Sequence, residues 1–241
     1  MTSPTFPGGT SVTRLSVYPD RCADGLAGGT PHLHTVSTEA YVVVGGAGTL
    51  QTLDPSGFRE TPLRAGSTVW FGPGVIHRAV NRGDLQVVVV MSNAGLPEAG
   101  DAVMTFPPEI VADPSRYREA ATLPAGSAQE AVRRRRDLAV EGFQRLVAGD
   151  RETLQAFYDS AAALVRPAVD GWRELWASTV ERETRRTAEV LDALARGDAR
   201  HLHDAALLES PPSDETRWGM CGRLKVLGLA RTGDTPPAGA A

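Results

Sequence analysis

Residues 28–46 read GGTPHLHTVSTEAYVVVGG, and this stretch decides the fold that the sequence predicts. His32 and His34 stand two positions apart, so on a β-strand their side chains project from the same face. Glu39 follows after the bend TVS, at the start of an apolar run, where the chain can turn back toward the two imidazoles. The pattern predicts two strands joined by a bend that brings two histidines and a carboxylate together.

A second stretch, residues 66–81, reads GSTVWFGPGVIHRAVN and supplies a third histidine. His77 follows the turn GPG, and Asn81 stands four positions later, on the same face of an extended chain. Three imidazoles and a carboxylate suit a borderline divalent transition metal, and a shared cation would partner imidazoles that are costly to bury alone. We therefore expect one metal ion, Fe(II), Mn, Ni, Zn or Cu, with four ligands: His32, His34, Glu39 and His77.

Together the two stretches resemble the cupin family. The first cupin motif is glycine, a spacer, H-x-H, four residues, glutamate, six residues and glycine, and its last glycine is Gly46 here. The second motif begins at Gly66, although Pro73 directly precedes Gly74, one position later than in the family. The leading glycine of the first motif is also out of register, but neither difference touches a ligand. The resemblance implies a small antiparallel β-barrel, the double-stranded β-helix or jelly-roll, with a metal at its centre.

The chain changes character about half-way along. From Ser11 to Thr105, short apolar runs alternate with glycine and proline, a pattern that predicts an all-β half. The predicted strands are TEAYVVV, GTLQTL, STVWF and LQVVVVM. The predicted turns are GGAG, DPSG, AGS, GPG and NRGD. Beyond Gly126 the apolar residues recur at helical spacing. The expected organisation is a cupin barrel over 1–110, a connector over 111–126, a helical region over 127–230 and a disordered tail over 231–241. Residues 218–230, WGMCGRLKVLGLA, fit either a strand or a helix.

Three features of the helical region have simpler explanations than a functional site. A stripe that includes Trp172, Trp176, Leu191 and Leu194 predicts a buried helix face, and the spacing of the two tryptophans fits core or interface anchors. The run Arg133–Arg136 lies beside acidic residues and predicts a solvated helix face. His201 and His203 repeat the H-x-H string, but on a helix these positions diverge by about 200 degrees, which argues against a metal site there.

Composition excludes several classes of function. The chain has 241 residues, 41% hydrophobic and 22% charged, as expected for a folded soluble protein. A net charge of -4 gives no indication of nucleic acid as a partner. No apolar run is long enough to span a membrane, no secretory signal is present, and two distant cysteines imply no disulfide framework. We expect a cytoplasmic protein that binds a small molecule and, as cupins commonly do, forms a homodimer.

Cupins carry many chemistries on one barrel, so the resemblance does not select a reaction. The first hypothesis is an enzyme that acts on a small polar organic substrate, with dioxygenase-type oxidation preferred. A metal-dependent isomerase, epimerase or lyase acting on a sugar-like or hydroxy-acid substrate is the alternative, with Glu39 or Tyr41 moving a proton. The second hypothesis is a non-catalytic cupin that senses a small ligand.

Overall fold

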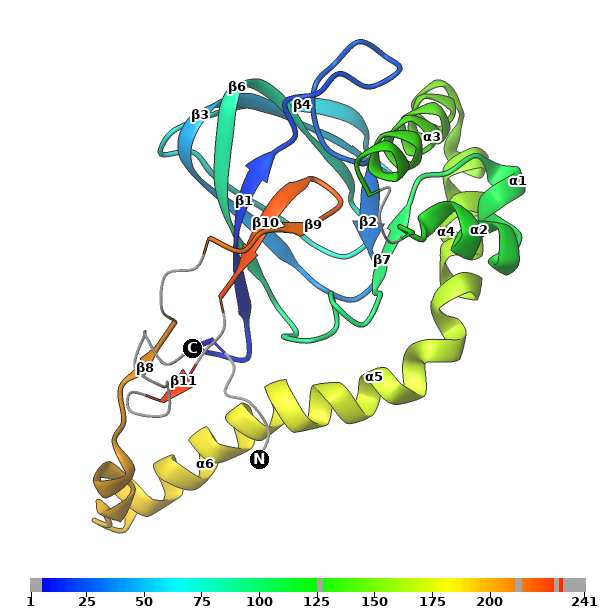
Figure 1. Cartoon of the computed structure of the whole chain (residues 1–241). Coiled ribbons are helices and arrows are strands. Elements are labelled where there is room, and N and C mark those ends of the chain that lie inside the picture. Colours follow the sequence, from blue (N-terminus) through cyan, green and yellow to red (C-terminus); the bar gives the residue numbers. More distant parts are fainter. Residues whose placement is uncertain (1–5, 125–127, 211–213, 228–229, 232–241) are drawn as a thin grey trace.

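The fold is built around one large antiparallel sheet followed by helices (Figure 1). The structure, a computed structural model, describes residues 6–124, 128–210, 214–227 and 230–231. The N-terminal strands are β1 (Ser11–Val17), β2 (His32–His34), β3 (Glu39–Asp54), β4 (Gly57–Arg64), β5 (Thr68–Phe71), β6 (Ile76–Met91) and β7 (Ala102–Met104). The sheet runs in the order β4-β3-β6-β1-β10-β9, with β5 on β3 and with β2 between β6 and β7. The predicted double-stranded β-helix is confirmed, but the sheet does not close into a complete barrel.

The two longest strands, β3 and β6, form the centre of the sheet. Each spans 16 residues, so β3 contains GTLQTL and all of TEAYVVV except its first residue, and β6 contains both the second-motif histidine and LQVVVVM. The expected turns at GGAG and NRGD are therefore wrong. Both segments are irregular stretches within continuous strands, and the register between β3 and β6 shifts between Val43 and Gly48.

Gly46 explains why the chain bends there without ending its strand. Its φ is +70°, a left-handed conformation that favours glycine, and a Cβ at this position would overlap the carbonyl oxygen of Asp84 on β6. Asp84 itself has a φ of +47°. The two strands thus bend together, and the last glycine of the first motif lets them approach closely.

The remaining turns lie where the sequence places them. Pro55 and Ser56 connect β3 to β4, and the side chain of Asp54 accepts a hydrogen bond from the backbone N–H of Ser56. The segments AGS and GPG connect β4 to β5 and β5 to β6. These short connections hold the strands that carry the motif residues in adjacent positions.

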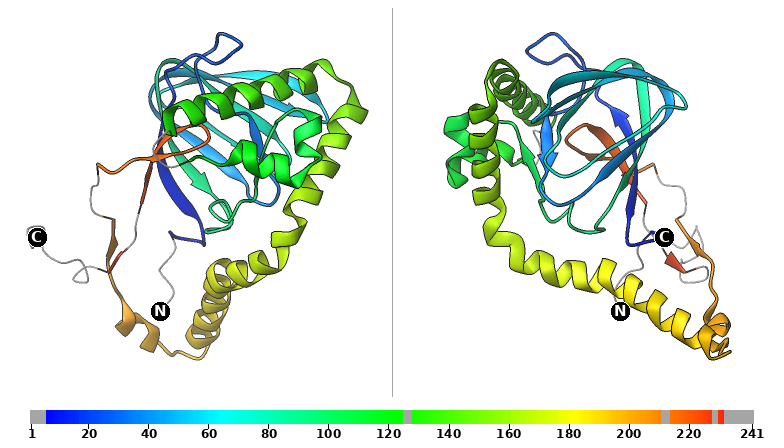
Figure 2. Two further views of the ribbon diagram at one scale, coloured as in Figure 1. Left: turned by 45° about the vertical axis from the view of Figure 1, so that its right-hand side comes forward. Right: turned by 180° about the vertical axis from the view of Figure 1, so that it is seen from behind.

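The helices follow β7 and partly cover one side of the sheet (Figure 2). They are α1 (Pro108–Val111), α2 (Pro114–Ala121), α3 (Ala128–Ala148), α4 (Arg151–Val165), α5 (Val169–Trp176) and α6 (Arg182–Ala195), with short turns at Arg166–Ala168, Ala177–Glu181 and Arg200–Asp204. Asp150 caps the start of α4, because its carboxylate accepts a hydrogen bond from the Thr153 N–H. No helix in the described ranges is long and apolar enough to cross a membrane.

Helices α3 and α4 bury their apolar faces against the end of the sheet that carries the first motif. Phe143 and Leu146 of α3 and Phe157 of α4 belong to the same buried cluster as Leu33 of β2. Leu33 lies between the two histidines of the motif, so its side chain points to the opposite face of the strand. Packing against the helices therefore fixes the orientation of both histidines.

The chain returns to the sheet after the helices, which corrects the expected extent of the helical region. Arg217–Trp218 and Gly222–Val226 form strands β9 and β10, and β10 pairs antiparallel with β1 from Thr13 to Val17. Short strands β8 (Leu208–Glu209) and β11 (Ala230–Arg231) pair with each other. Helix thus ends by Asp204 rather than 230, and residues 218–226 belong with the barrel. Residues 232–241 of the expected tail lie outside the described residues.

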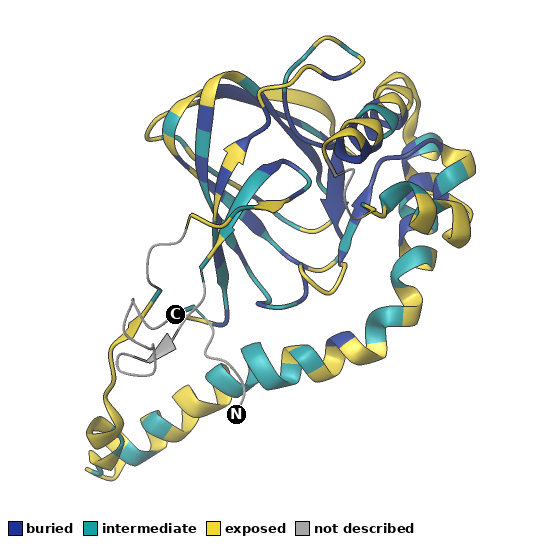
Figure 3. Cartoon of the chain, viewed as in Figure 1, coloured by how far each residue is buried: buried dark blue, intermediate teal, exposed yellow. Residues whose placement is uncertain are grey.

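Two expectations about the helical region are wrong in part. Trp172 is buried and its indole N–H donates to the Ala99 carbonyl, but Leu191 and Leu194 are 62% and 50% exposed, because α6 extends away from the sheet (Figure 3). Arg133 and Arg134 lie on a solvated face as expected. Arg135 and Arg136 are instead buried, since α3 presents them to backbone carbonyls of the barrel.

Replacing Gly46 by alanine tests the close approach of β3 and β6. We expect Gly46→Ala to lower the free energy of unfolding by about 4 kcal/mol or more, because the new Cβ forces the Asp84 backbone to move. Gly66→Ala is the matched control: its φ is +88° but its Cβ would meet open space, so only the conformational cost of about 1–2 kcal/mol applies. Urea denaturation measures both, and equal losses would contradict the steric explanation.

Candidate metal centre

The four predicted ligands lie together inside the sheet. His32 and His34 belong to β2, and β2 pairs with β6 so that His32 stands directly opposite His77. Glu39 begins β3, where it pairs with Phe71 of β5 and Met91 of β6. One potential ligand atom from each of the four residues lies within 4.8 Å of the others, and all four side chains are buried.

The carboxylate of Glu39 stands between the imidazoles. Its Oε2 is 3.1 Å from His77 Nε2 and 3.3 Å from His34 Nε2. The rings of His32 and His77 lie with centroids 4.2 Å apart. This is the set of nitrogen and oxygen donors that the spacing of the two motifs predicts.

Each histidine is anchored through its other ring nitrogen. His32 Nδ1 lies 2.8 Å from the Thr30 carbonyl oxygen and His77 Nδ1 lies 3.1 Å from the Val75 carbonyl oxygen. A carbonyl oxygen only accepts, so Nδ1 carries the proton in both rings and leaves the Nε2 lone pair available. His34 Nδ1 lies 2.6 Å from Asp101 Oδ1. All three Nε2 atoms are therefore directed toward the centre of the cluster.

Two buried atoms at the centre make no hydrogen bond. Glu39 Oε2 and His77 Nε2 have no partner of acceptable geometry within the described residues, although they lie 3.1 Å apart. Unsatisfied buried polar atoms are costly, and a lone pair on each could be satisfied by one cation. The residues present therefore fit a divalent transition metal held by nitrogen and oxygen donors.

Without a metal, charge concentrates on His34 and Glu39. Burial by itself would lower the pKa of His34, but the hydrogen bond to Asp101 and the contact with Glu39 outweigh it and raise the pKa to about 9. Burial would raise the pKa of Glu39, yet the neighbouring His77 and His34 hold it well below the usual range. Burial, His77 and His34 lower the pKa of His32. The metal-free site is thus a His34 imidazolium paired with carboxylates.

Asp101 is a member of the site that the sequence reasoning missed. It is fully buried, its Oδ2 accepts from the Ser37 N–H and its backbone carbonyl accepts from the Thr35 N–H. These contacts fix both His34 and the bend that leads to Glu39. Asp101 precedes β7, which pairs with β2, and only that pairing, not any motif in the sequence, would have placed it there.

Tyr41 is buried two positions after Glu39, as the strand alternation predicts. Its hydroxyl lies 3.7 Å from Cys221 Sγ, and its ring packs edge-on against Phe71 and His77. Burial, with smaller effects of Cys221 and Glu39, raises the pKa of Tyr41 well above the ordinary value. The hydroxyl therefore stays protonated.

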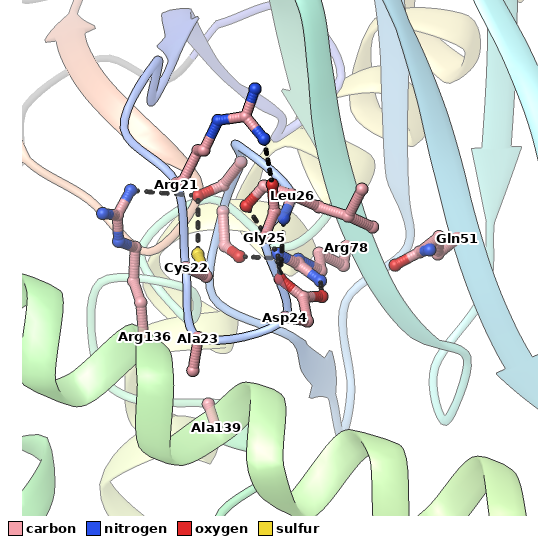
Figure 4. Close-up of polar contacts among 12 residues, drawn as sticks. Arg21, Cys22, Ala23, Asp24, Gly25, Leu26, Gln51, Arg78, Arg136 and Ala139 are labelled. Atoms are coloured by element: carbon pink, nitrogen blue, oxygen red, sulfur yellow. Dashed lines mark hydrogen bonds and ion pairs between the residues drawn. The ribbon is translucent and has the colours of Figure 1, made fainter.

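The loop before β2 is fastened to β6 and to α3 by two arginine side chains (Figure 4). Arg78 follows His77 and points away from the site, where it pairs with Asp24 and donates from Nε to the Gly29 carbonyl. Arg136 of α3 donates to the Gly28 carbonyl. Arg78 is thus a structural cation that holds the entry to β2.

Asn81 and the second H-x-H string lie outside the cluster. The Asn81 amide donates to the Val17 carbonyl and its oxygen accepts from the Gly83 and Leu85 N–H groups, so it supports the irregular stretch of β6. His201 and His203 lie in a short helical turn and are not among the clustered donors of the described chain.

A cavity of about 270 Å³ opens beside the cluster. Its walls include three of the four clustered residues and residues of β1, β6 and the C-terminal strands. The lining residues are Thr13, Leu15, His32, His34, Glu39, Val89, Met91, Pro97, Glu98, Trp218, Gly219, Met220, Cys221 and Leu224. Burial is the main cause that raises the pKa of Cys221 to about 12, so its thiol is neutral.

The fold and the donor set agree with a sequence comparison against protein families. Residues 23–93, which contain both motifs and all four clustered residues, match the family described as Cupin domain. This segment is a cupin domain. The cupin match ends before the helices, and the comparison with curated proteins gave no match.

Solved structures resemble the chain over its cupin part. A variant of Streptomyces PAC13 with uridine is similar over 43% of this chain and 69% of its own, at 19% identity and a TM-score of 0.31; Pac13 is described as a nucleoside dehydratase. An uncharacterized double-stranded β-helix protein from Klebsiella pneumoniae is similar over 36% of this chain and 70% of its own, at 20% identity and a TM-score of 0.30. A cupin protein from Bacteroides fragilis covers 36% and 65%, at 18% identity and a TM-score of 0.27. Similarity at this level carries no information on the substrate.

Metal binding should expel the proton that His34 holds. Because its pKa is about 9 in the metal-free protein, zinc binding at pH 7.5 should release about one proton, and zinc affinity should rise with pH up to about 9. Calorimetry in buffers of different ionisation enthalpy measures the number released. Asp101→Asn removes the partner that raises this pKa, so the variant should release fewer protons. No release from the parent protein would contradict the imidazolium assignment.

Proposed function

We propose that this protein is a mononuclear divalent-metal cupin enzyme acting on a small polar organic substrate. The observation that carries the proposal is the cluster of His32, His34, Glu39 and His77, with their Nε2 and carboxylate atoms converging beside a cavity. A metal held there supplies Lewis acidity and open coordination positions next to that cavity. The Nδ1 anchors keep the imidazoles oriented whether or not substrate is present.

The residues around the cluster limit how protons move. Glu39 is the buried carboxylate nearest the centre, so it is the group we propose as a ligand that also accepts a proton from substrate. Tyr41 holds its proton firmly and contacts Cys221, so its proposed role is to donate a hydrogen bond rather than to act as a base. The role of Glu39 follows from its position beside His34 and His77, and that of Tyr41 follows from its burial.

Dioxygenase-type oxidation is the reaction that we favour, and isomerisation, epimerisation or elimination is the alternative. The cavity wall is largely apolar, which suits oxidation of an apolar group better than proton transfer on a sugar or hydroxy acid. A sensing cupin without catalysis is the other class. Its ligand would occupy the same cavity, and turnover distinguishes an enzyme from a sensor.

Metal content is the first test. Protein purified without chelator should contain about one transition-metal ion per chain. His77→Ala and Glu39→Gln should each reduce that content strongly, since the first removes an imidazole donor and the second replaces the charged carboxylate by a neutral amide. His201→Ala with His203→Ala is the matched control, because it deletes imidazoles outside the cluster. Elemental analysis that finds no metal in the parent, or equal losses in the control, would rule out the proposed centre.

Oxygen consumption separates the two reaction classes. The iron-loaded protein, screened against small organic substrates, should consume oxygen in step with substrate loss, and both should stop in Glu39→Gln. Turnover that continues at the same rate without oxygen would instead support an isomerase or lyase. Specific ligand binding with no turnover under either condition would support the sensor.

We also propose that the protein is a cytoplasmic homodimer. The support is the apolar stripe of α6, where Leu191 and Leu194 are exposed along with Trp176 of α5. Leu191→Glu with Leu194→Glu should convert a dimer to a monomer in size-exclusion chromatography with light scattering, because burying two carboxylates at an apolar contact is unfavourable. Arg186→Glu on another face of α6 should leave the mass unchanged. A monomeric parent protein would rule out this interface.

A further inference from the structure

The C-terminal hairpin, defined as residues 217–226, forms one wall of the metal cavity. Five of its residues line the space next to the ligands: Trp218, Gly219, Met220, Cys221 and Leu224. The hairpin lies beside β1, far along the chain from the ligands and outside the segment that matches the cupin family (Figure 1). The wall is therefore supplied by a part of the chain that the two motifs do not include.

The turn of the hairpin is held by a buried arginine from α3. Arg135 Nη2 donates to the Gly219 carbonyl at 3.1 Å, and the Tyr18 hydroxyl donates to the same oxygen at 2.9 Å. Arg135 Nη1 donates to the Ala121 carbonyl at 3.3 Å. No carboxylate pairs with Arg135 within the described ranges, and the side chain is only 8% exposed. Its charge is directed to backbone carbonyls alone.

The same turn contacts the segment that leads into the ligands. The Met220 carbonyl accepts from the Thr30 N–H, two residues before His32, and the Cys221 carbonyl accepts from the Tyr18 N–H. Movement of the hairpin would therefore open the cavity and release one support of β2. The hydrogen bonds to the Gly219 carbonyl therefore keep the cavity closed and keep the support of β2 in place.

We propose that the C-terminal hairpin is the substrate-selecting wall of the metal cavity and that Arg135 is the residue that positions it. The wall that it presents consists mainly of the side chains of Trp218, Met220 and Leu224, with the neutral thiol of Cys221. Thr13 and Glu98 are the polar residues of the lining besides the ligands, and no lysine or arginine is among the described lining residues. The part of the substrate that does not reach the metal is thus small, apolar and not anionic.

This selection rests on the proposed metal function, whereas the positioning by Arg135 does not. A cavity of about 270 Å³ lies at the small end of ligand sites. An anionic group on the substrate has only the metal to pair with, so at most one such group is accommodated. Helix α3 gains a specific role, which is to hold the cavity wall in place.

Thiol labelling of Cys221 tests the positioning. In a Cys22→Ser background Cys221 is the remaining cysteine, and it is buried in the closed hairpin. Arg135→Gln should raise the rate at which Cys221 reacts with iodoacetamide by about tenfold or more, because loss of the hydrogen bond from Arg135 to the Gly219 carbonyl lets the hairpin open locally. Tyr18→Phe should raise it less, and Arg135→Lys, which retains a donor, should partly restore the slow rate.

Arg134→Gln is the matched control, because Arg134 is the neighbour on the same helix and pairs with Glu130 at the surface. It should label at the background rate. Circular dichroism and thermal unfolding verify that each variant is folded at the labelling temperature. Background-rate labelling in Arg135→Gln would overturn the positioning role of Arg135, whatever the rate in Tyr18→Phe.

Carboxylate probes test the wall. Zinc-loaded protein should bind hexanoate more tightly than acetate in calorimetry, because the longer chain contacts the apolar wall. Met220→Ala should lower the affinity for hexanoate by about tenfold and leave the affinities for acetate and for zinc unchanged. Equal affinity for the two acids, or an unchanged hexanoate affinity in Met220→Ala, would overturn the proposal that the hairpin selects the substrate. A parent protein that binds no zinc would overturn the proposed function, and Cys221 labelling would still decide the role of Arg135.

Discussion

The Nδ1 anchors of three buried histidines are the constraint around which the cupin domain is arranged. Two anchors are backbone carbonyls, of Thr30 and Val75, and the third is the Asp101 carboxylate. Their acceptors belong to three separate segments, so all three must be placed before the Nε2 atoms can converge. The fixed bends of β3 and β6, the packing of Leu33 against the helices and the ion pair of Arg78 with Asp24 all serve this placement. A metal site of this kind needs rigid surroundings more than it needs many ligands.

How much the sequence predicts depends on whether a residue acts through its own strand. His32, His34, Glu39 and His77 were predictable because strand alternation and two short turns determine where they point. The sequence alone predicts turns at GGAG and NRGD, because glycine and aspartate with left-handed φ occur both in hairpins and in bulged strands. Only the pairing of β3 with β6 distinguishes the two. Asp101 and Cys221 were not predictable, since each reaches the site through contacts between segments far apart in sequence.

The burial of two residues in the arginine run Arg133–Arg136 also depends on contacts between distant segments, which the sequence alone does not reveal. Four consecutive arginines on one helix face all directions, so two of them had to point toward whatever the helix packs on. Charge alone predicts that all four arginine side chains are exposed to solvent. Burial of Arg135 and Arg136 becomes understandable only when backbone carbonyls that can accept their hydrogen bonds, such as those of Gly219 and Gly28, lie opposite the helix.

The position of β1 in the sheet has a consequence for how the molecule assembles. Strand β1 pairs on one edge with β6 and on the other with β10, whose residues lie about 200 positions later. Closing so long a loop is slow, and a growing chain exposes the ligand-bearing strands well before β10 has been made. In that interval the second edge of β1 is unpaired and open to association with other chains. Pairing of β10 with β1 thus covers this exposed edge in the same step that completes the cavity.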